Sequence, residues 1–192
     1  MYLLILGLVI FLGVHATAIV APTWRDAQVA RRGEAVWKGA YALLSLIGLA
    51  LIAYGYGEAR SAPVVLYEPP ASLRHVAWLL MLPVFPLLLA TYLPGRISAA
   101  TKHPMLLAVK LWALAHLLAN GTLASTLLFG AFLAWAVADR ISLKHRPASP
   151  VRRTAGAPAG RYNDAIAIVA GLGLYAAFLG VLHVWLIGVS PR

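Results

Sequence analysis

Cysteine is absent from the sequence, and this absence narrows the chemistry open to the protein. Disulfides, thiolate metal clusters, a cysteine nucleophile and the C-x-x-C-H attachment of c-type haem are all excluded. Acidic residues are scarce, with 6 Asp and Glu against 16 Lys and Arg. The basic residues fall between apolar runs and form no continuous stripe, so nucleic acid is not an expected partner. No Ser-His-Asp arrangement, P-loop or H-E-x-x-H motif supports hydrolysis or nucleotide chemistry.

Hydrophobic residues make up 61% of the chain and charged residues 11%, which lies outside the range of a soluble domain of this length. Several apolar runs approach the length of about 20 residues that crosses a bilayer. The sequence therefore predicts one all-α domain over residues 1–192, a polytopic bundle of about six transmembrane helices. The expected helices lie near 2–21, 36–55, 76–93, 104–119, 122–138 and 164–188.

The distribution of Lys and Arg predicts the orientation of this bundle. Basic residues concentrate in the first, third and fifth connectors, and such connectors face the cytoplasm in membrane proteins. Both termini are then expected on the opposite side. The fifth connector, about 144–162, is rich in Pro, Ala, Gly and Arg and predicts a flexible basic tether beside anionic membrane lipid.

Three histidines lie inside apolar runs, where an ionisable side chain marks a functional site by default. From the helical rise, His15 lies roughly 10 Å and His116 about 18 Å from the cytoplasmic face, so the two meet near mid-bilayer once helix tilt is allowed for. His183 is roughly 28 Å deep on the same scale and fits a shared site less well. Two imidazoles from facing helices commonly hold b-type haem in a bundle. We predict His15 and His116 as the metal ligands of haem b iron.

Small residues flank both predicted ligands. They admit a flat macrocycle, or alternatively they only allow tight helix packing. These residues are Gly13, Ala16 and Ala18 around His15, and Ala113, Ala115 and Ala119 around His116.

Three further residues join the predicted cofactor-binding set. Lys110 lies inside the fourth span, where it either meets a haem propionate or extends to the lipid headgroups. Trp112 is four residues before His116 on the same helical face, and Asn120 is one turn after it. Asn120 is expected to orient the imidazole or to cap the helix. The other histidines, His75, His103 and His145, are expected at membrane interfaces, and no catalytic residue is identified.

Several strings identify the chain as similar to the NnrU family. They are LGLVIFLGVHATAIVAPTWR, GEAVWKGAYALLSLIGLALIAYGYGEAR, LYEPP, YLPGR and HPMLLAVKLWALAHLLANG. The resemblance implies a bacterial inner-membrane protein linked to denitrification, with nitrite or nitric oxide reductases as partners. In such a membrane, the distribution of Lys and Arg described above puts both termini in the periplasm. The family is in turn similar to 15-cis-zeta-carotene isomerase, a haem b enzyme with two histidine ligands. Matching the motifs places those ligands on His15 and His116.

These residues and the resemblance leave three functions open. The first is a haem-dependent isomerase-like or redox activity on a lipid-soluble substrate such as a carotenoid. The second is a non-enzymatic haem or electron relay, or an assembly factor for nitrite and nitric oxide reductases. The third is a small-solute transporter, although no convincing internal repeat is present.

Overall fold

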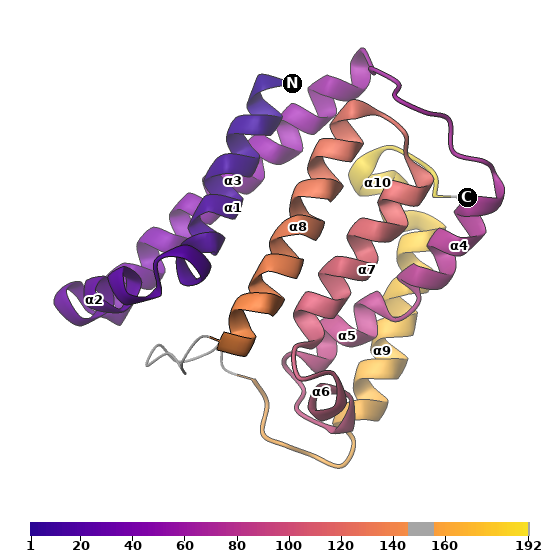
Figure 1. Cartoon of the computed structure of the whole chain (residues 1–192). Helices are drawn as coiled ribbons and strands as arrows, with labels where there is room; N and C mark the ends of the chain where they lie inside the picture. Colours follow the sequence, from indigo (N-terminus) through magenta and orange to yellow (C-terminus); the bar gives the residue numbers. More distant parts are fainter. Residues whose placement is uncertain (146–155, 192) are drawn as a thin grey trace. The chain divides into compact units, whose positions relative to one another are not determined.

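The computed structural model describes residues 1–145 and 156–191, and its regular structure in that part of the chain is helical (Figure 1). Five segments are long and apolar enough to cross a membrane, and Pro104–Ala119 forms a shorter apolar helix. The predicted all-α bundle of about six helices is confirmed. The five longer segments are Tyr2–Val20, Glu34–Ser61, Ser72–Ala90, Leu123–His145 and Asn163–Ile187.

The described residues form two compact units that each use two separate stretches of the chain. Unit 1 contains residues 1–68 and 120–145, and unit 2 contains residues 69–119 and 156–191. The helices of unit 1 are α1 (Tyr2–Val20), α2 (Pro22–Arg32), α3 (Glu34–Ser61) and α8 (Leu123–His145). Those of unit 2 are α4 (Ser72–Met81), α5 (Val84–Ala90), α6 (Arg96–Thr101), α7 (Pro104–Ala119), α9 (Asn163–Ala177), the π-helical segment η1 (Phe178–Leu182) and α10 (His183–Ile187).

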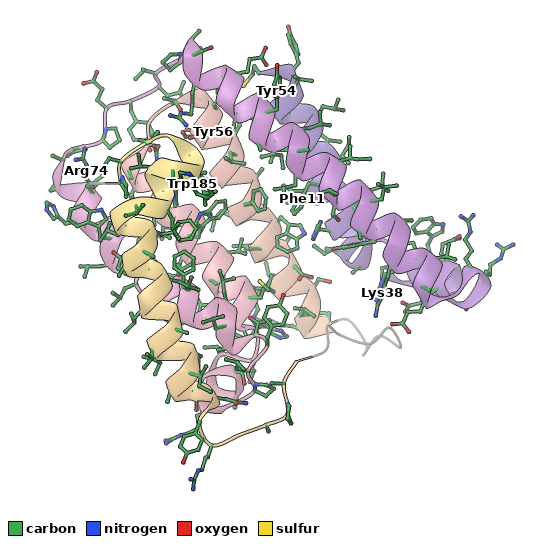
Figure 2. The ribbon with its side chains drawn as sticks, turned by 180° about the vertical axis from the view of Figure 1, so that it is seen from behind. Phe11, Lys38, Tyr54, Tyr56, Arg74 and Trp185 are labelled. Atoms are coloured by element: carbon green, nitrogen blue, oxygen red, sulfur yellow. The ribbon has the colours of Figure 1, made fainter. Side chains whose placement is uncertain are left out.

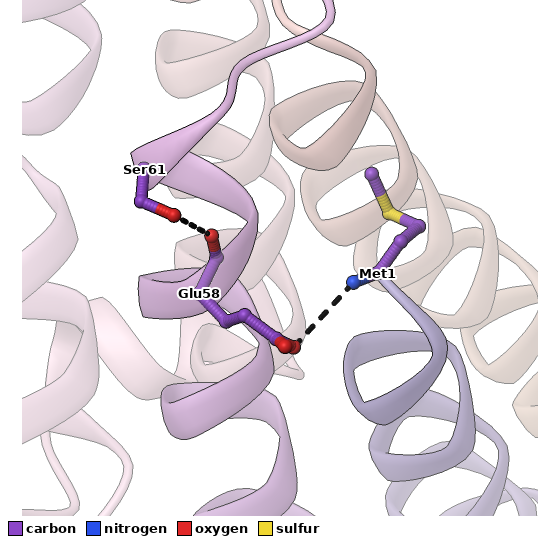
Figure 3. Close-up of polar contacts among 3 residues, drawn as sticks. All are labelled: Met1, Glu58 and Ser61. Atoms are coloured by element: carbon purple, nitrogen blue, oxygen red, sulfur yellow. Dashed lines mark hydrogen bonds and ion pairs between the residues drawn. The ribbon is translucent and has the colours of Figure 1, made fainter.

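Helices α1 and α3 of unit 1 pack antiparallel with their backbones close together. A Cβ atom added to Gly7 would lie 2.6 Å from the backbone nitrogen of Ile52, and one added to Gly48 would lie 2.8 Å from that of Phe11. Glycine at these positions therefore allows the close approach. At one end of the pair, the N-terminal amine lies 3.6 Å from the Glu58 carboxylate (Figure 3).

Helix α8 completes unit 1 against α1 and α3. Tyr56 points from α3 toward α8, where its hydroxyl lies 2.9 Å from the Oγ of Ser125, and the ring of Phe11 on α1 contacts that of Phe132 (Figure 2). The connector after α3 is tied to the start of α8 because the Leu123 amide donates to the Val64 carbonyl. The contact between Phe11 and Phe132 lies one helical turn before His15 on α1.

Unit 2 has its core where α5 meets α7, at Val84, Leu87 and Ala108. Helix α9 packs on α5 at a point where Gly171 touches the backbone of Pro86, and α7 also packs on α4. The third predicted span is interrupted between α4 and α5, next to Pro83, whose ring cannot donate the helical hydrogen bond.

The N-terminus of α6 is capped from another helix. The Asp164 carboxylate at the start of α9 accepts hydrogen bonds from the backbone amides of Arg96 (2.8 Å) and Ile97 (3.0 Å). An acidic group is favourable there because the amides at a helix start have no partner within the helix. The contact sets the level at which α9 begins relative to α6.

Two helices were not expected from the sequence. Helix α2 begins at Pro22, a residue suited to the first helical turn, and it carries Arg31 and Arg32 in its last turn. Both α2 and α6 are too short and polar to be membrane spans. Part of the predicted tether, residues 146–155, lies outside the described residues. At its end the Ala157 amide donates to the Tyr92 carbonyl, which fixes residues just before α9.

Candidate functional site: partly buried imidazoles

His15 lies on α1 of unit 1 within a cluster of aromatic side chains. Its ring stacks on Phe11, with centroids 4.2 Å apart and planes inclined by 23°. The rings of Tyr41 and Trp135 lie at 5.0 Å and 5.8 Å from the imidazole. Its Nδ1 lies 2.7 Å from the Phe11 carbonyl oxygen, one helical turn earlier. Helices α1, α3 and α8 therefore jointly position this imidazole.

The indole of Trp135, which faces the edge of His15, carries a buried polar atom. Among the described residues, its Nε1 is one of three buried side-chain atoms without a hydrogen-bond partner, with Ser45 Oγ and Thr126 Oγ1. A buried donor without an acceptor is costly, and such an atom points to a bound polar group. The cluster around His15 thus fits a ligand that carries an acceptor.

His116 lies on α7 of unit 2 and is oriented in the same way as His15. Its Nδ1 lies 2.8 Å from the carbonyl oxygen of Trp112, and the Trp112 ring lies 5.4 Å from the imidazole centroid. Trp112 therefore lies beside His116, as their spacing of four residues predicts. The ring of His183 also lies near His116, with the two ring centroids 6.4 Å apart and the ring planes inclined by 21°.

His183 is the first residue of α10 and follows the π-helical segment η1. A π turn holds one more residue than an α turn, so it rotates the residues that follow by about 100° relative to a continuous α-helix. The His183 Nδ1 lies 2.7 Å from the Val189 carbonyl oxygen. The segment that carries Val189 is held in turn by the Trp78 indole, which donates to the Pro191 carbonyl at 2.8 Å.

All three imidazoles share one chemical property. A carbonyl oxygen only accepts hydrogen bonds, so each Nδ1 must carry the proton and each Nε2 the lone pair. Histidine ligands of metals characteristically donate their other ring N–H to a carbonyl or carboxylate, which fixes the tautomer and the ring orientation. The donor set therefore fits the axial ligation of haem iron by imidazole nitrogen. Among the described residues, no group of three or more His, Cys, Asp or Glu side chains forms a metal site.

The depth estimate that separated His183 from His116 is wrong. It assumed that both helices begin at one level, whereas Asp164 at the start of α9 reaches the N-terminus of α6, a helix that precedes α7 in the chain. Helix α9 therefore begins at the level of α6, beyond the first residue of α7 along the helix direction (Figure 1). The sequence does show an acidic residue, Asp164, at the expected start of the last helix. It does not show that the Asp164 carboxylate accepts a hydrogen bond from the Arg96 amide, which sets the different starting levels of α9 and α7.

The small residues near the two predicted ligands differ in their surroundings. Ala113 and Ala115 on α7 are fully buried, which agrees with tight helix packing. A Cβ atom added to Gly13 on α1 would meet nothing within 4 Å. Gly13 is exposed, so close helix packing does not explain it.

Lys110 and Asn120, the two other predicted residues, lie away from His116, one earlier on α7 and one just after its end. Lys110 is partly buried and precedes His116 by six residues, which is about 9 Å along the helix and about 120° around it. Asn120 follows the last residue of α7, and its backbone carbonyl accepts a hydrogen bond from the Tyr67 hydroxyl at 3.0 Å. The propionate role of Lys110 and the orienting role of Asn120 remain predictions.

The remaining histidines lie near helix ends. His103 directly precedes α7, His145 is the last residue of α8, and His75 stacks edge-on against Trp78 in the first turns of α4. In all three cases the position agrees with the expected location outside the apolar centre of a span.

A helical membrane protein with oriented imidazoles inside its apolar helices is the class that these observations define. The chain belongs to the NnrU protein family, which matches residues 3–191 and thus nearly the whole sequence. Searches of curated proteins and of solved structures found no match.

Proposed function

We propose that this NnrU protein binds haem b, which two histidine imidazoles would hold, one of them that of His116. The observation that carries the proposal is the shared geometry of three partly buried histidines, whose Nδ1 atoms face backbone carbonyls at 2.7 to 2.8 Å. Each Nε2 then offers a lone pair to iron. The sequence resemblance favours His15 as the second ligand.

The remaining residues of the predicted set would shape the pocket. Trp112 would lie beside the ring of its neighbour His116, with which it is already in contact. Lys110 would pair with a propionate, and Asn120 would steady the end of α7. When bound, haem supplies one-electron chemistry and a Lewis-acidic iron, while the protein supplies orientation and exclusion of water.

We place this activity in the bacterial inner membrane, with both termini periplasmic and membrane lipid around the helices. A redox or isomerase-like reaction on a lipid-soluble substrate such as a carotenoid is the leading function, in the context of denitrification. The unpartnered Trp135 indole beside His15 favours it, because a substrate or cofactor acceptor would satisfy that donor. The alternatives are a haem or electron relay, an assembly factor for nitrite or nitric oxide reductase, and a small-solute transporter.

The decisive experiment is an absorption spectrum of the full-length protein, purified after expression with haem available. We expect a Soret band and a dithionite-reduced spectrum of six-coordinate haem b. His116→Ala should lose stable haem, whereas His145→Ala at the end of α8 should keep it. A wild-type protein without a Soret band would refute haem binding, and uptake of a solute into proteoliposomes would then favour the transporter.

A second measurement separates an enzyme from a relay. Carbon monoxide is added to the dithionite-reduced protein. Ready CO binding indicates that a ligand position opens on reduction, as a substrate reaction at iron requires. A ferrous form that stays six-coordinate without CO supports the relay, in which both imidazoles remain bound in both oxidation states.

A further inference from the structure

The imidazole of His183 lies near that of His116, and the spacing of the two rings is informative. Two imidazoles on opposite sides of one metal, each with a metal–nitrogen bond of about 2 Å, place their ring centroids roughly 6 Å apart. The observed separation is 6.4 Å. The separation of the two ring centroids therefore agrees with the spacing that one shared metal ion would need.

The orientation of the His183 ring is set by the π turn before it and by hydrogen bonds in the segment after it. The π turn that precedes it changes the face on which it emerges, and π turns of this kind are frequent at functional sites. Its Nδ1 is fixed by the Val189 carbonyl, and the segment with Val189 is held by the Trp78 indole through Pro191. Trp78 is itself in place because the Tyr175 hydroxyl donates to its carbonyl at 3.0 Å.

Both imidazoles also belong to one compact unit. His116 comes from α7 and His183 from α10, and both helices are part of unit 2. Both residues of this pair therefore come from unit 2 alone.

We propose that His183 is the second axial ligand and that His116 and His183 hold the haem iron together within unit 2. This proposal rests on the haem-binding function proposed above and replaces His15 as the partner of His116. His15, which lies in unit 1, is then not a ligand of this iron.

The test exchanges each candidate ligand for methionine in the full-length protein. Methionine is itself a haem ligand and raises the reduction potential when it replaces histidine. We expect His183→Met to retain haem, to raise the midpoint potential and to change the ferrous spectrum. His15→Met should leave both unchanged. His145→Met, at the exposed end of α8, is the control and should behave as wild type.

A second variant distinguishes loss of a ligand from loss of the fold. His183→Ala should lower haem affinity by roughly ten-fold or more, and added imidazole should restore the six-coordinate spectrum if the protein is folded. Elution as a single species in detergent provides the check on folding. Restoration by imidazole is an outcome that a purely structural role of His183 would not give.

The outcomes separate the two proposals. If His183→Met keeps the wild-type potential and spectrum while His15→Met changes both, His183 is not a ligand and the haem-binding function still stands. If the wild-type protein carries no haem at all, the proposed function itself fails, and the assignment of His183 fails with it.

Discussion

A histidine in an apolar helix serves as a ligand only when its ring is held in one tautomer and one direction. For His15 and His116, the carbonyl one turn earlier holds the ring, using the second lone pair that helical hydrogen bonding leaves on the oxygen. The sequence identifies these two residues because they are rare polar groups in apolar runs. It does not reveal their orientation, which depends on the rotamers that packing selects.

His183 shows where reasoning from single residues fails. Its partner carbonyl belongs to Val189, six residues later, and not to the preceding turn of its own helix. That contact depends on a chain reversal at Gly188, which has a φ of +78° that favours glycine. Position along the chain therefore could not predict which way this ring points.

Removal of the Trp78 indole N–H is expected to weaken haem binding without loss of the fold. Trp78→Phe keeps an aromatic ring but releases the Pro191 carbonyl, so the segment that orients His183 becomes looser. Residues that orient a metal ligand typically contribute about 10-fold to affinity. Haem titration of the apo-protein measures the effect, with Trp185→Phe on the exposed side of α10 as control. Equal haem affinities of Trp78→Phe and wild type would show that the hydrogen bond from Trp78 to the Pro191 carbonyl does not contribute to haem binding.

Lys110→Met tests the propionate contact. A similar-length apolar side chain should keep α7 intact, while loss of a charge-assisted hydrogen bond should weaken haem binding by on the order of 1–3 kcal/mol, or roughly ten-fold or more. Haem titration is again the measurement, and Lys144→Met near the end of α8 is the control. If haem affinity is unchanged, Lys110 only extends to the lipid headgroups.

At the scale of elements, the apolar runs predict the membrane helices well and the connectors poorly. Helix α7 has the predicted bounds 104–119, since Pro104 and the Asn-Gly pair at its two ends are strong local signals. Helix α8 extends seven residues beyond the predicted end at 138, because a helix continues into charged residues at the membrane surface where hydropathy falls. Helices α2 and α6 depend on end contacts that carry no hydropathy signal.

The close packing of α1 on α3 predicts opposite effects for two neighbouring glycines. A Cβ at Gly55 would overlap the backbone of Leu4, whereas one at Gly57 would meet nothing within 4 Å. Gly55→Ala should therefore destabilise the protein by about 1–3 kcal/mol through overpacking. Gly57→Ala should stabilise it by about 0.5–1 kcal/mol because alanine loses less backbone entropy in a helix.

Thermal unfolding of the two variants in one detergent measures this difference. The melting temperature should fall for Gly55→Ala and rise slightly for Gly57→Ala. A lower melting temperature for both, or for neither, would mean that the α1–α3 contact is not the source of the effect.

At the scale of the whole molecule, the absence of cysteine makes the predicted topology directly testable. A single cysteine can be placed at Ala30 on α2 or at Ala71 before α4, both exposed positions. Ala71→Cys should react with a membrane-impermeant thiol reagent in intact spheroplasts. Ala30→Cys should react only after lysis, since the basic α2 is expected on the cytoplasmic side. The reverse labelling pattern would place both termini in the cytoplasm.

The two-unit arrangement has a consequence for the order of events during synthesis. Unit 2 begins at residue 69 but is finished only by residues 156–191, after α8 has been added to unit 1. His116 therefore enters the membrane well before His183 has been translated. If the two imidazoles share the iron, cofactor loading is confined to the period after translation of the last helix, and a stalled nascent chain cannot capture haem prematurely.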